Sequence, residues 1–173
     1  INLFRPFIDA GLITLDANGK VVSWEAMPWP SGGSIAVALA RSDDAALTAK
    51  VGTLLTSLAT DPKTRIAHVA DKAEIAKLGG NPQVAFFVDL KPGALAGGFA
   101  ADAPLVKPSR SKGMHGYFPA LPEMRSTFLI MGKGVAKGHN LGEIDMRAIA
   151  PTLARRLGAE LPAAQVPALR IEP

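Results

Sequence analysis

"SIAVALARSDDAALTAKVGTLLTSLATDPKTRIAHVADKAEIAKLGGNPQVAFFVDL", from Ser34 to Leu90, decides the fold because it alternates between β-rich and helical patterns. Short runs rich in β-branched and aromatic residues predict three strands, at residues 34–40, 65–70 and 83–90. Helical patterns separate these runs, and the segment has no internal repeat. We therefore expect a compact α+β unit on a small sheet, over about residues 33–100.

Helix start and stop signals define the two helices of this unit. Ser42 or Asp43 is expected to cap the longer helix, and Asp61-Pro62 to end it. Its apolar residues recur at helical spacing, namely Ala46, Leu47, Val51, Leu54, Leu55 and Leu58. Asp71 is expected to cap a shorter helix that ends at Gly79-Gly80.

The residues before this unit predict a helix and a hairpin. Asn2 is expected to cap a short helix with apolar residues on one face, ended by Gly11. The Asn18-Gly19 pair between two β-rich runs predicts a hairpin with a type I′ turn. "MPWPSGG" (27–33) is expected to interrupt any strand, because it contains two prolines and two glycines.

The residues after the unit predict one more strand and one more helix. Residues 101–114 are expected to form a loop, and "RSTFLIM" (125–131) a short buried strand. A helix is expected to start near Ile149 and end at Gly158, with Ile149, Leu153 and Leu157 on one face. Pro151 then lies in the first turn, where its missing N–H costs nothing, and Asp145 is a cap or first-turn charge.

Composition bounds the function classes. The chain has 173 residues, of which 48% are hydrophobic and 20% charged, which is typical of a globular domain. It lacks cysteine, which excludes disulfides and thiolate metal sites, and no apolar run approaches a membrane span. The net charge of +4 is not arranged as a basic stripe with aromatic residues, so we expect no nucleic-acid partner. The densest basic cluster (107–112) is expected to be a solvated loop.

Three histidines are the strongest candidates for chemistry. His115 lies between Gly113 and Gly116, directly before the expected buried strand. It is therefore either a loop residue without a chemical role or a metal ligand. His68 is assigned a structural role within a strand, and His139 is expected to be a solvent-exposed loop residue.

Other motifs have simpler interpretations. "GKGVAKG" (132–138) lacks the spacing of a phosphate-binding loop and is expected to be a turn. Ser31-Gly32-Gly33-Ser34 has no neighbouring base and is expected to be a hinge. Trp24 and Trp29 are expected to pack in the core or at a domain junction.

Two segments nevertheless resemble a known family. "KGMHGYFPALPEMRSTFLIMGKGV" (112–135) and "LGEIDMRAIAPTLARRLGAELP" (141–162) resemble the C-terminal part of bacterial type I phosphodiesterase/nucleotide pyrophosphatase proteins, in the alkaline phosphatase superfamily. That family carries G-[ST]-H-G-[YF], then P-x-M-R-x-x-F-[IL]-x-x-G-x-G, then a helix containing A-P-T-[IL]-A-x-x-L-G. "INLFRPFIDAGLI" (1–13) is similar to the stretch after the family's D-x-D-H-G motif. Met114 departs from the pattern, where a small hydroxyl residue is usual.

The resemblance implies an α/β fold: an alkaline-phosphatase-like core with a small inserted α+β unit. Residues 1–32 would belong to the core, residues 33–100 would be the inserted subdomain, and residues 101–173 would be the C-terminal part of the core. His115 would be a metal ligand, in a protein that binds two zinc ions and hydrolyses a small-molecule phosphoester. The nucleophile and the other ligands would lie upstream of Ile1, in the N-terminal half of the same protein, so we expect the chain to be a part that is inactive alone. A periplasmic or secreted location is compatible with the resemblance.

Two alternatives remain from the residues themselves. The α+β unit could be a non-enzymatic binding or interaction module, in which case His115 has no metal to bind. The net positive charge leaves nucleic-acid binding as a third and weaker reading, which salt-sensitive binding to a duplex would support.

Overall fold

The chain forms two compact units. The computed structural model describes all 173 residues and divides into Ile1–Arg125 and Ser126–Pro173. Its secondary structure is mixed α+β, with two small antiparallel sheets and four α-helices. None of the helices combines the length and the apolar composition that crossing a membrane requires.

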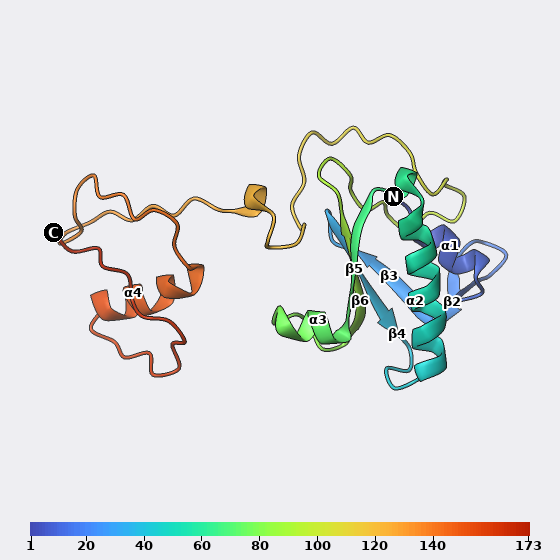
Figure 1. Ribbon diagram of the computed structural model, residues 1–173, viewed down its shortest axis with the longest axis horizontal. Helices are drawn as coiled ribbons and strands as arrows, with labels where there is room; N and C mark the ends of the chain where they lie inside the picture. The colour runs from blue at the N-terminus through green and yellow to red at the C-terminus, as the bar shows by residue number, and fades with distance from the viewer. The chain divides into compact units, whose positions relative to one another are not determined.

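The main sheet of the first unit is four-stranded and antiparallel throughout (Figure 1). Its strand order is β3-β4-β6-β5, so β4 and β6 are the central strands. The three strands predicted from the pattern are confirmed, as β4 (Ser34–Leu39), β5 (Ile66–Asp71) and β6 (Val84–Leu90). The α+β prediction for this region is therefore correct.

The prediction that "MPWPSGG" would interrupt the sheet is wrong for its first half. β3 (Ala26–Pro30) contains both prolines and pairs with β4, with Pro28 opposite Val37 and Pro30 opposite Ile35. A proline lacks the N–H that a central strand needs, but an edge strand can turn that side of the backbone to solvent. β3 is an edge strand, so it tolerates both prolines. The main sheet therefore includes residues before Gly33, where the pattern predicted the unit to begin.

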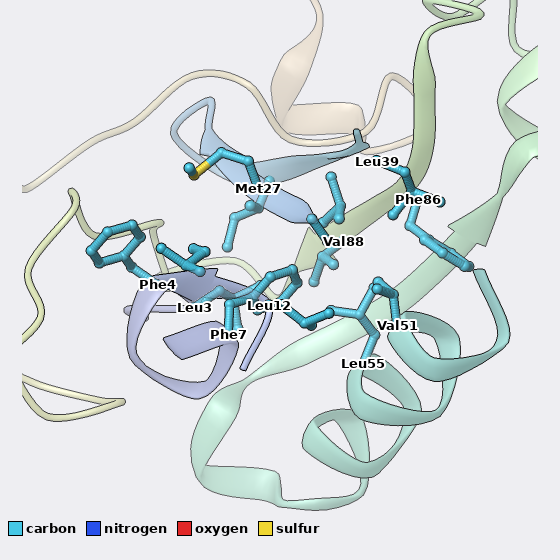
Figure 2. Packing of buried hydrophobic residues seen from close by; sticks show 14 of the residues in the cluster. Leu3, Phe4, Phe7, Leu12, Met27, Leu39, Val51, Leu55, Phe86 and Val88 are labelled. Atoms are coloured by element: carbon cyan, nitrogen blue, oxygen red, sulfur yellow. The ribbon is translucent and has the colours of Figure 1, made fainter. Parts of the chain in front are cut away.

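Helix α2 (Ala45–Thr60) covers one face of the main sheet (Figure 2). Leu47, Val51 and Leu55 are its buried residues, and they pack with the alternate side chains of β4 and β6 that are also buried. The helix is capped by Asp44, whose carboxylate accepts a hydrogen bond from the Leu47 N–H at 2.8 Å. The expected caps, Ser42 and Asp43, lie two residues and one residue too early, because Ser and Asp can both cap a helix and the pattern alone does not choose between them.

The opposite face of the sheet is only partly covered. The short helix α3 (Lys72–Lys77) begins at Asp71, whose carboxylate accepts from the Glu74 N–H, so the predicted cap is confirmed. Its Ile75 packs with Ala70 and Val84 in a small second cluster, against which Phe87 and Phe118 are partly buried. Phe118 belongs to the segment that contains His115, which is described in the next subsection.

The N-terminal residues pack on the same core as α2. Phe4 and Phe7 of helix α1 (Phe4–Asp9) are buried, as are Leu12 and Ile13 beside them (Figure 2). Asn2 does not cap this helix, contrary to expectation. Its amide instead donates hydrogen bonds to the carbonyl oxygens of Ala100 and Ala103, at 2.7 and 3.0 Å.

The predicted hairpin is present, with a different turn. Strands β1 (Ile13–Leu15) and β2 (Val21–Trp24) pair antiparallel. A type I′ turn needs positive φ at both central residues, but only Gly19 has it, at 77°. Asp16 explains the difference, because its carboxylate accepts from the N–H groups of Asn18 and Lys20 and organises a longer loop.

The second unit contains one α-helix and no strand. Helix α4 (Ile149–Arg156) starts at the predicted residue, with Pro151 in its first turn, and the Asp145 side chain caps the 3₁₀ turn before it. Its buried side chain is that of Thr152, whereas Leu153 and Leu157 are exposed, so the predicted apolar face is not buried.

The buried strand predicted at 125–131 is absent. Leu129 and Met131 are 86% and 91% exposed, and the segment has no regular structure. A strand needs a neighbouring strand to bond its backbone, and the second unit offers none.

The packing units differ from the segments expected from the resemblance. Residues 1–32 and 33–100 share one hydrophobic core and one main sheet, and the boundary between compact units falls at 125/126. Whether these segments belong to a larger phosphatase-like core stays a prediction.

The first unit should depend on the α2 interface. Leu55 is fully buried against the sheet, so Leu55→Ala should lower the free energy of unfolding by about 2–5 kcal/mol, measured by chemical denaturation. Lys50→Ala, at an exposed position of the same helix, is the control and should change it by less than about 0.5 kcal/mol. Equal effects of the two substitutions would contradict the packing described.

Candidate functional site

The His115 segment, defined as residues 114–118, is held against the turn that joins β3 and β4. The Gly33 N–H donates a hydrogen bond to the His115 carbonyl oxygen at 2.8 Å. The same turn is bonded to the chain after β6, since the Gly32 carbonyl accepts from the Ala96 N–H at 2.7 Å. The predicted hinge at Ser31–Ser34 is thus a tight, bonded turn.

Glycines make this close approach possible. Gly116 has a φ of 80°, and a Cβ built there would overlap the Ser31 carbonyl oxygen. Gly32 has a φ of 88°, and its Cβ would overlap the His115 carbonyl oxygen. A Cβ on Gly33 would enter the ring of Tyr117. The segment and the turn therefore meet backbone to backbone, in a contact that side chains would prevent.

The two aromatic residues after Gly116 anchor the segment on its other side. The Tyr117 hydroxyl donates to the Ala94 carbonyl oxygen at 2.6 Å, and its ring packs against the main core. The Phe118 N–H donates to Oδ1 of Asp89 at 3.2 Å. Its ring meets those of Phe87 and His68 edge-on, with centroids 6.2 and 6.5 Å apart.

Asp89 is a charged residue in a central strand. Its neighbours across the sheet are Ser34 of β4 and His68 of β5. Partial burial raises the pKa of the Asp89 carboxyl above its usual value, against the lowering effect of the Phe118 and Leu90 N–H groups and of nearby His68.

The His115 side chain itself is exposed, and its imidazole makes no hydrogen bond or ion pair with the rest of the chain. A free imidazole on a fixed backbone suits a metal ligand. No group of three or more His, Cys, Asp or Glu side chains in the chain could hold an ion, however.

The other two histidines lie elsewhere. His68 is exposed on the edge strand β5, and its Nε2 lies 2.7 Å from Oε2 of Glu74. This pair ties β5 to α3, in agreement with a structural role. His139 is exposed in the second unit, as predicted.

The basic cluster and the tryptophans can be compared with expectation. The basic cluster at 107–112 is exposed, as expected of a solvated loop. Trp29 was expected to be packed but is 51% exposed, in edge-on contact with Phe99, which is 49% exposed. Trp29 lies in the edge strand β3, next to its C-terminal end.

Comparison with protein-family models, with curated proteins and with solved structures finds no match for this chain.

Sequence reasoning singled out His115 but missed the residues that hold it. The sequence pattern predicts only a strand position for Asp89, and Tyr117 enters only as a letter of the family motif. One signal was available: Asp is rare in strands, so its presence inside "VAFFVDL" indicates a specific partner.

Gly116→Ala should disrupt the segment, because both the positive φ and the Ser31 oxygen oppose a side chain. We expect lost or shifted NMR signals for residues 31–33 and 114–118, with a lower melting temperature. Gly113→Ala is a matched control, since a Cβ there meets open space. Similar spectra for the two variants would contradict the contact.

Asp89 should also give stability a specific pH dependence. Because its pKa is raised in the folded state, its favourable contribution exists at low pH and is lost as pH rises through the raised value. Asp89→Asn removes this loss, so the variant should gain stability relative to the parent protein as pH rises from about 3 to 6. Urea denaturation across this range measures the difference, and a constant or falling difference would contradict the burial effect.

Proposed function

We propose that the chain is the C-terminal part of a metal-dependent phosphoester hydrolase of the phosphodiesterase/nucleotide pyrophosphatase type. In this proposal it contributes a metal ligand, His115, to an alkaline-phosphatase-like α/β core, and it is inactive alone. The observation that carries the proposal is the combination of the G-M-H-G-Y motif with an exposed, unbonded imidazole on a glycine-fixed backbone.

The physical support is preorganisation. A ligand must present its lone pair at a fixed place, and a ring on a rigid backbone loses little entropy when it does so. The Gly33–His115 hydrogen bond and the Tyr117 and Phe118 anchors fix the backbone at His115 and in the three residues that follow it.

In the proposed enzyme, this chain and the N-terminal half of the protein would contribute different groups to the active site. Two zinc ions, when bound, would supply Lewis-acid stabilisation of a phosphoester. His115 would hold one ion through a neutral ring nitrogen, and the segment would keep that nitrogen in place. The nucleophile and the remaining ligands would come from the N-terminal half. The α+β unit would cover the site beside the turn at residues 31–33 and influence the choice of leaving group.

The second candidate is a non-enzymatic interaction module. The observation that favours it is the exposed Trp29–Phe99 pair beside an edge strand, since exposed aromatic rings are common at binding surfaces. In this case His115 is irrelevant to function, and Trp29→Ala should abolish partner binding.

His115→Ala separates the two candidates. In the full-length protein it should lower kcat/KM for p-nitrophenyl phosphoesters with added zinc by at least about 100-fold, because ligand loss weakens metal binding and misplaces the ion. His139→Ala, which removes another exposed imidazole, is the control and should leave activity within about twofold.

The isolated 173-residue chain should show no hydrolysis under these conditions. Turnover by the chain alone, or full activity of the His115→Ala protein, would defeat the proposal.

A further inference from the structure

Asp89 occupies a place that a strand would normally give to an apolar residue. β6 is a central strand, and the other residues on the same face of it are Ala85 and Phe87. A partly buried carboxylate there costs desolvation energy, and Asp is disfavoured in strands in general. Such a local violation is expected where a residue has a specific task.

The task visible in the structure is to hold the Phe118 amide. Oδ1 of Asp89 accepts the hydrogen bond from the Phe118 N–H at 3.2 Å, three residues after His115. The Tyr117 hydroxyl is bonded to the Ala94 carbonyl, four residues after the strand ends. Together with the Gly33 N–H bond to the His115 oxygen, these contacts fix the backbone from the His115 carbonyl to the Phe118 amide.

The residue beside Asp89 on the edge strand is a histidine. His68 is its cross-strand neighbour on β5, and the His68 imidazole is in turn paired with Glu74 of α3 at 2.7 Å. The ring of Phe118 lies next to these residues, in edge-on contact with the rings of His68 and Phe87.

We propose that Asp89 is a positioning residue for His115: its carboxylate fixes the Phe118 amide and thereby the backbone from which the imidazole projects. The inference rests on the proposed function for the consequence at the metal, but the anchoring itself is a property of this chain alone. Asp89 touches neither ion nor substrate. Its effect passes through Gly116 and Tyr117, the two residues between His115 and Phe118.

The anchor can be measured without any metal. In the 173-residue chain, Asp89→Ala should speed hydrogen exchange of the Phe118 amide by about tenfold, the equivalent of one net hydrogen bond. The amide of Val51 in the core of α2 should be unaffected. Asp89→Asn keeps an oxygen acceptor and should stay within about twofold of the parent protein. Asp43→Ala removes an exposed carboxylate elsewhere and is the control.

The consequence for the ligand is measured in the full-length protein. Asp89→Ala should weaken zinc binding, followed by competition with a chelator, by about tenfold or more, while Asp89→Asn restores it. This rescue distinguishes positioning from a general loss of stability, because Asp89→Ala and Asp89→Asn can be compared at matched fractions folded.

The outcomes separate the inference from the function it rests on. Unchanged Phe118 exchange in Asp89→Ala overturns the anchoring, whatever the enzyme does. Faster exchange with unchanged zinc affinity overturns the positioning role, provided that His115→Ala does weaken zinc binding. If His115→Ala has no effect on zinc, the proposed function fails, and the exchange result still decides whether Asp89 anchors the segment.

Discussion

The contact between two glycine-containing backbones is the constraint on which the candidate site depends. The turn at residues 31–33 and the segment around Gly116 approach so closely that no side chain fits between them. This close approach allows the hydrogen bond between the Gly33 N–H and the His115 carbonyl oxygen, which fixes the segment. The main sheet supports it, because the turn is the direct continuation of two paired strands. The ring of Tyr117 packs against the main hydrophobic core, and the ring of Phe118 packs against the small second cluster.

Much of the first unit could be predicted from the sequence, and for physical reasons. The apolar spacing of α2 and the alternation in β6 each match a single structure, so "AALTAKVGTLL" and "QVAFFVDL" were assigned correctly. Caps were less certain, because Ser42, Asp43 and Asp44 are equivalent in isolation and only the bond to the Leu47 N–H distinguishes them. β3 was missed, because whether a proline is tolerated depends on strand order, which is not a local property.

The second unit shows the opposite case. "TFLIM" has the composition of a buried strand, but composition does not supply a neighbour, and the segment is exposed and irregular. For the candidate site, His115 could be found because histidine is rare in this chain. The strand position of Asp89 signals that it has a partner, but the sequence cannot identify that partner, because it is a backbone amide 29 residues away that only the completed fold brings near.

The prolines of β3 have one more consequence. They deprive one edge of the main sheet of donors at two alternate positions, whereas β5, at the other edge, contains no proline. A further strand therefore finds fewer backbone donors at the β3 edge than at the β5 edge, which makes β3 the edge that is better protected against strand-to-strand association.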